Sequence, residues 1–84
     1  MNERFRDMPV HLKHRDAHAN SFRFYRLDLQ PSQFGGCSLV RQWGRIGTWG
    51  RQTVSLFETW DAAETERSRF VQVKCQRGYT EVPS

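Results

Sequence analysis

The sequence predicts an α+β fold in which an antiparallel sheet of four to five strands carries one helix on its apolar face. Two observations lead to this prediction. Between residues 8 and 59, apolar and polar residues tend to alternate, the period of strands that bury one face. From residue 61 the apolar residues recur with the period of a helix instead. A chain of 84 residues is expected to form one domain.

Four strands are expected before the helix. Residues 8–15 alternate clearly and lead through a polar connection into a second strand at 22–29. The apolar phase of that strand changes between Phe24 and Tyr25, which indicates either a bulge or a strand that starts at Tyr25. After a turn-rich loop, residues 37–45 and 52–59 are the third and fourth strands. The short glycine-rich link between them predicts an antiparallel hairpin.

The helix signal begins at residue 61. Asp61 followed by Glu64 fits a capping box, in which the first residue caps the helix N-terminus. A narrow stripe on one helix face is formed by Ala63, Arg67, Phe70 and Lys74. Gly78 is the expected C-terminal cap, and residues 79–82 are expected to add a short edge strand.

The positive charge is unevenly distributed along the chain. The formal net charge is +4, and residues 1–51 hold nine basic side chains against four acidic ones. Eight of those nine are arginines, whose planar guanidinium suits bidentate contact with phosphate. Charge therefore favours a nucleic-acid partner about as strongly as it favours a mildly basic soluble domain.

Several classes of protein are not supported by the sequence. No apolar run is long enough to span a membrane, and the N-terminus lacks the apolar segment of a secretion signal, so a cytoplasmic location is expected. Cys37 and Cys75 form no Cys-x-x-Cys pair, and His11 and His14 are expected on opposite strand faces. We therefore expect neither a metal nor a cofactor.

Binding is expected rather than catalysis. The serines have no histidine in a recognisable arrangement, and Glu64 and Glu66 point to different helix faces. The glycines at 44, 47 and 50 join two strands, whereas a phosphate-cradling loop joins a strand to a helix. The sequence predicts no catalytic residues and no small-molecule substrate.

The stretch from Trp43 to Arg51 contains Trp-Gly-Arg twice. Alternation places Arg41, Trp43 and Arg45 on one strand face, as a flat aromatic flanked by two cations. Such a set can stack on a base or ribose while the guanidiniums contact neighbouring phosphates. The alternative is that Trp43 packs against the helix and the arginines cap the sheet edge. Trp49 lies in the turn itself, where it is expected to be exposed or folded back over the hairpin.

These features resemble the WGR domain family, which is named after the tripeptide. The resemblance covers about residues 20–80 and rests on Tyr25-x-Leu27-x-Leu29, Leu39-x-Arg41-x-Trp43-Gly44-Arg45-Ile46-Gly47-x-x-Gly50 and Ala63…Phe70…Lys74…Gly78-Tyr79. It implies a twisted antiparallel sheet with a helix across it. In poly(ADP-ribose) polymerases the domain helps to recognise DNA ends and nicks. There the motif Trp packs on the DNA backbone and the motif Arg links DNA contact to neighbouring domains.

By position these family roles fall on Trp43 and Arg45, whereas the second tripeptide matches the family only at its glycine. The resemblance implies a single WGR-like domain over residues 1–84, of a small stand-alone bacterial type. The chain has no room for a catalytic ADP-ribosyltransferase domain, so binding carries over and catalysis does not.

The expected function is a non-catalytic nucleic-acid-binding module, with DNA ends or nicks as the favoured ligand. The expected binding residues are Trp43, Arg45, Arg41, Trp49 and Arg51. Two alternatives remain: a protein–protein adaptor that uses the same surface, and an accessory subunit of a separately encoded enzyme.

Overall fold

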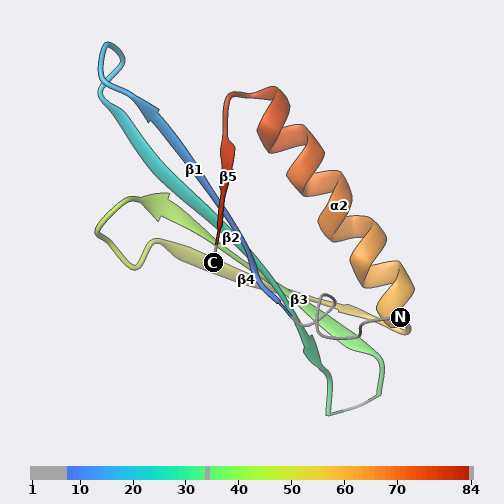
Figure 1. The fold of residues 1–84 in the computed structure, drawn as a ribbon. Helices are drawn as coiled ribbons and strands as arrows, with labels where there is room; N and C mark the ends of the chain where they lie inside the picture. The colour runs from blue at the N-terminus through green and yellow to red at the C-terminus, as the bar shows by residue number, and fades with distance from the viewer. Residues whose placement is uncertain (1–7, 34, 84) are drawn as a thin grey trace.

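The computed structural model describes residues 8–33 and 35–83, and it has the predicted α+β architecture (Figure 1). Across these residues one five-stranded antiparallel sheet, in the order β4-β3-β2-β1-β5, carries one helix. The elements in chain order are β1 (Val10–Asp16), β2 (Ser21–Pro31), β3 (Cys37–Arg45), β4 (Arg51–Phe57), α2 (Trp60–Gln76) and β5 (Thr80–Val82).

Strand β2 is continuous, so the predicted bulge or late start at Tyr25 is wrong. Its pairing with β3 runs without interruption from Arg23 opposite Arg45 to Pro31 opposite Cys37. Since successive side chains alternate between faces, Tyr25 points to the helix side while Phe24 points to the other side. The change of apolar phase in the sequence therefore reflects apolar residues on both faces of one regular strand.

The core lies between the sheet and α2, which crosses one sheet face (Figure 1). Its buried members come from β1, β2, β3 and the helix, and they are Leu12, Tyr25, Leu27, Leu29, Cys37, Leu39 and Ala63. At its margin Trp43, Phe70 and Tyr79 are among the half-buried residues that pack against it. The side chain of Cys37 is fully buried, as expected for a cysteine that serves as a small apolar residue.

The helix begins one residue before Asp61, so the predicted capping box is wrong. Thr59 is the N-cap: its backbone is extended, and its side-chain oxygen accepts a hydrogen bond from the Ala62 amide at 3.1 Å. Asp61 instead lies in the first turn, where its charge suits the helix dipole. A threonine with an extended backbone accepts a hydrogen bond from a first-turn amide as well as an aspartate does. The sequence alone therefore does not distinguish Thr59 from Asp61 as the N-cap.

The C-terminal end of α2 follows the prediction. Gly78 adopts a positive φ of +97°, a conformation that glycine reaches without strain. The Gly78 amide donates to the Cys75 carbonyl and the Tyr79 amide donates to the Lys74 carbonyl, both at 3.1 Å. This paired arrangement is a Schellman motif, and it turns the chain back so that β5 pairs with β1.

Candidate nucleic-acid interface

The two Trp-Gly-Arg copies meet across the β3–β4 hairpin. Trp43 pairs with Arg51 in the strand register, and a Cβ added at Gly44 would lie 2.7 Å from the Cα of Gly50. Gly50 itself has a φ of +69°, and a Cβ there would overlap the carbonyl oxygen of Trp43. The two glycines therefore allow the backbones at the end of the hairpin to approach closely.

Trp43 belongs partly to the core and partly to the surface. Its indole stacks on the buried ring of Tyr25, with the ring centroids 5.8 Å apart and the planes at 18°. It is half-buried, on the sheet face that carries the helix. Alternation sets Arg41 and Trp43 on the same strand face, and the fold puts that face under the helix. One part of the indole packs in the core, as the alternative of a packed Trp43 requires, and the rest lines a surface hollow.

That hollow lies at the end of the sheet near the β3–β4 turn, and we call it the arginine hollow. Three strands contribute a guanidinium each: Arg23 from β2, Arg45 from β3 and Arg51 at the start of β4. Arg23 and Arg45 are directly opposite each other in the register. The other lining residues are Trp43, Gly44, Thr48 and Gly50, so no carboxylate is among them.

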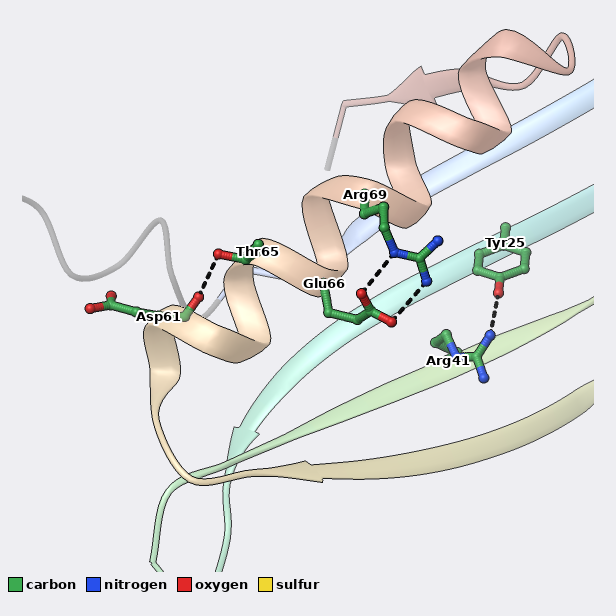
Figure 2. Close-up of polar contacts among 6 residues, drawn as sticks. All are labelled: Tyr25, Arg41, Asp61, Thr65, Glu66 and Arg69. Atoms are coloured by element: carbon green, nitrogen blue, oxygen red, sulfur yellow. Dashed lines mark hydrogen bonds and ion pairs between the residues drawn. The ribbon is translucent and has the colours of Figure 1, made fainter.

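Arg41 lies in the seam between the sheet and the helix. Its Nη1 donates a hydrogen bond to the hydroxyl of Tyr25 at 3.2 Å (Figure 2). Its guanidinium carbon lies 4.3 Å from the centre of the Phe70 ring and 5.7 Å from that of Trp43. Arg41 is therefore held by packing and is not one of the residues that line the arginine hollow.

On the helix above Arg41, Glu66 and Arg69 form an exposed ion pair (Figure 2). Arg69 donates two hydrogen bonds of 2.8 Å to the two carboxylate oxygens. The hydrogen bonding from Arg69 lowers the pKa of the Glu66 carboxyl, and the charge of Arg41 adds a smaller effect in the same direction. The charge of Arg69 is thus already compensated within the helix.

Lys74 extends the cationic surface, and sequence reasoning gave it no binding role. Its Nζ lies 4.6 Å from the centre of the Tyr25 ring and 5.5 Å from that of Tyr79. Burial lowers the pKa of the Lys74 ammonium, and the nearby positive charges of Arg77, Arg41 and Arg23 lower it further. Arg23 and Arg77 were likewise missed. No local sequence pattern indicates Arg23, because its place beside the motif strand follows from the register of β2 against β3.

Trp49 is 87% exposed at the tip of the hairpin, as one of the two predicted arrangements requires. Its carbonyl accepts a 2.7 Å hydrogen bond from the side chain of Gln42, which ties the turn to β3. The indole is not among the residues that line the arginine hollow. The structure thus brings Trp43, Arg45 and Arg51 together, leaves Trp49 projecting nearby, and places Arg41 beneath the helix.

Several acidic residues follow the C-terminal end of β4. Strand β4 begins at Arg51 and leads into Glu58, and the first half of α2 contains Asp61, Glu64 and Glu66. The basic residues of the hollow lie instead near the β3–β4 turn, which projects away from α2 in Figure 1. Arg51 therefore lies at one end of β4, and Glu58 directly follows the other end.

Within residues 8–33 and 35–83, no group of three or more His, Cys, Asp or Glu side chains is placed to hold a metal. His11 and His14 face opposite sides of β1, as predicted, because they are three positions apart on one regular strand. In the same part of the chain, no helix combines the length and the apolar character needed to cross a bilayer.

The fold is a small α+β domain with a cationic, aromatic end. The chain belongs to the WGR domain family, whose model matches residues 8–84. This family is known in general as a nucleic-acid-binding module, and the match indicates no catalytic family.

Two further proteins are similar to this chain. An uncharacterized protein of Sinorhizobium fredii, y4dW, is 33% identical over 75 residues, which are 89% of this chain. A crystal structure of a Bacteroides fragilis protein superposes with a TM-score of 0.76 at 22% identity over 90% of the chain, a likeness of fold. The chain spans 37% of the length of the first protein and 20% of the second.

Proposed function

We propose that the chain is a non-catalytic DNA-binding module that holds the phosphate backbone in the arginine hollow. The observation that carries the proposal is the convergence of Arg23, Arg45 and Arg51 on one hollow whose lining contains no carboxylate. Among residues 8–33 and 35–83, none of the three guanidiniums has a carboxylate partner. Like charges brought together without counter-charges are most simply explained by an anionic ligand.

The type of cation favours phosphate. A guanidinium presents a planar fork of donors that matches two phosphate oxygens, and it stays charged at any physiological pH. Lys74 provides further positive charge near Arg23, with Arg77 close to it. Such a surface can follow several phosphates of one strand, and contacts of this kind provide affinity without sequence specificity.

The aromatic residues favour DNA ends or nicks over continuous duplex. Trp43 lines the same hollow as the arginines, where its accessible part can pack on a sugar. Trp49 projects from the turn as a flat apolar plate. A break exposes the face of a base pair, on which an indole can stack, whereas intact duplex hides these faces. The resemblance to polymerase WGR domains implies the same preference.

A protein–protein adaptor is the second candidate, and the exposure of Trp49 favours it. Trp and Arg are the side chains that most often dominate protein interfaces. The two candidates respond differently to salt, because phosphate contacts release counterions while a packed aromatic contact does not. A role as accessory subunit of a separate enzyme would use the same adaptor surface.

The test compares nicked, blunt-ended, single-stranded and end-capped continuous DNA, each fluorescently labelled, at low and moderate salt. We expect binding that weakens with salt and is tighter for nicked or blunt DNA than for capped duplex. The double variant Arg45→Gln/Arg51→Gln should lose most of the binding, whereas Arg69→Gln removes an already paired charge and should bind like the wild type. Absence of DNA binding at low salt would refute the proposal, as would full binding by the double variant.

A further inference from the structure

We propose that the outer edge of β4, which pairs with no strand within residues 8–33 and 35–83, pairs antiparallel with β4 of a second copy of this chain. The result is a two-fold symmetric dimer with one continuous ten-stranded sheet. The proposal is independent of the nucleic-acid function. It rests on the outer strand, whose first residue Arg51 also lines the arginine hollow, and on the sheet face opposite the helix.

The two edges of the sheet are protected very differently. The β5 edge is three residues long, contains Glu81 and is followed by Pro83. The β4 edge is seven residues long and, after Arg51, contains no charge, no proline and no glycine. Folded proteins normally protect a free edge with charges, proline or short length, because an open edge offers unpaired backbone groups to another strand. Only the β5 edge has these devices.

The outer strand also exposes apolar side chains. Val54 is 55% exposed and Leu56 is 64% exposed, and both lie on the face away from α2 because Ser55 between them pairs with the core residue Leu39. Val54 pairs with Val40, so an apolar stripe reaches the edge of the sheet. The remaining side chains of β3 and β4 on this face, those of Ser38, Gln42 and Gln52, are uncharged.

A second copy of the chain fits this edge by charge. Strand β4 starts at the basic residue Arg51, and the acidic residues Glu58 and Asp61 follow its other end. Antiparallel pairing sets the basic end of each copy beside the acidic end of the other. Parallel pairing would bring like charges together, and like charges on neighbouring strands are destabilising.

One register also makes the apolar side chains complementary. With Ser55 opposite Ser55 of the second copy, Val54 of each chain lies opposite Leu56 of the other. Two-fold symmetry about an axis perpendicular to the sheet keeps both helices on one face and joins the two apolar stripes on the other face. The pairing occupies both β4 edges. The outer edges that remain consist of β5 and of the part of β1 that β5 does not cover, which contains Arg15 and Asp16, so the assembly closes at two chains.

The first test is the mass of the chain by sedimentation equilibrium across a wide range of protein concentration. We expect the mass to rise from 10.0 kDa toward twice that value. Leu56→Lys places a charge near the symmetry axis in each copy and should weaken the dimer by roughly tenfold or more. Ser68→Lys adds the same charge on an exposed position of α2 and should leave the dimer unchanged.

A crosslinking experiment tests the register. Cys75→Ser removes the exposed thiol, while Cys37 is buried and stays unreactive. In that background Ser55→Cys should be joined by a short bis-maleimide into a covalent dimer, whereas Gln52→Cys should not, because its counterpart in the other copy lies several residues away. Circular dichroism checks the fold of each variant.

Three results would overturn the proposal. A mass of one chain at every concentration would show that β4 does not pair with a second copy, and its edge would then be available only to a strand of a different protein. Open-ended oligomers would contradict the closed two-fold pairing. Crosslinking of Gln52→Cys as efficient as that of Ser55→Cys would contradict the register. None of these results depends on DNA binding, so failure of this proposal and failure of the proposed function can be told apart.

Discussion

Neutralising the arginines of the hollow should flatten the salt dependence of DNA binding more than any other change of equal charge. The perturbation is Arg23→Gln, Arg45→Gln and Arg51→Gln, singly and together. All three side chains line the same hollow, and no carboxylate lies in its lining. Glutamine keeps a polar side chain of moderate length, so the loss of charge dominates the effect.

The structure sets the expected magnitude. Each cation that neutralises one phosphate contributes about 0.9 to the slope of log K against log salt concentration for duplex DNA. If the three arginines and Lys74 each contact one phosphate, the slope is about −3.6, and a fourfold rise in salt lowers the affinity roughly 150-fold. The triple variant keeps only Lys74, so its slope is about −0.9 and the same rise in salt costs roughly 3.5-fold.

The assay is fluorescence anisotropy of a labelled blunt duplex, titrated with protein at several salt concentrations. Arg69→Gln is the matched control, since its guanidinium is paired with Glu66 on the helix and its slope should equal that of the wild type. Circular dichroism verifies that the triple variant is folded. A triple variant whose slope equals the wild-type slope would refute the assignment of the hollow as the phosphate site.

Five substitutions in the hairpin and the helix separate packing from binding. Trp43→Ala should lower the free energy of unfolding by about 2 kcal/mol in urea titrations, because the half-buried indole stacks on the core. Trp49→Ala should change it by less than about 0.5 kcal/mol while reducing the preference for DNA ends, and equal destabilisation by both would contradict this division. Gly50→Ala should destabilise the hairpin by about 2 kcal/mol or more. Gly47→Ala should destabilise the protein clearly less. Gly47 also has a positive φ, but the space around it is open. A thermal shift assay that compares the melting temperatures of the two variants therefore measures the effect of the overlap with Trp43. Lys74→Met should weaken DNA binding without lowering stability at neutral pH. The folded-state pKa of Lys74 is lowered, so the unfolded chain holds this proton more tightly, and wild-type stability should rise relative to Lys74→Met as pH increases from that lowered pKa toward about 10.4. The opposite trend with pH would contradict the burial of the ammonium.

Local patterns in the sequence were sufficient for the elements. Alternation located four strands to within about two residues of their bounds, and Gly78 marked the end of the helix because its backbone needs a positive φ. The start of the helix was misplaced, since Thr59 and Asp61 are both good N-cap residues and only the backbone conformation distinguishes them. The phase change at Tyr25 was misread for a related reason: alternation says which residues share a face, and it does not say what covers each face.

The composition of the candidate site required the tertiary structure. The sequence alone determined that Arg41, Trp43 and Arg45 share one face of a strand, because that follows from the period of a strand. The fold decided that α2 covers this face as far as Arg41, which packs against Phe70, and leaves the turn end open. Pairing between β2 and β3 brought Arg23 opposite Arg45, although the two residues are 22 positions apart in the chain. Side-chain period is a local property, whereas strand register and helix placement depend on long-range packing, so only the folded chain shows which charges share one surface.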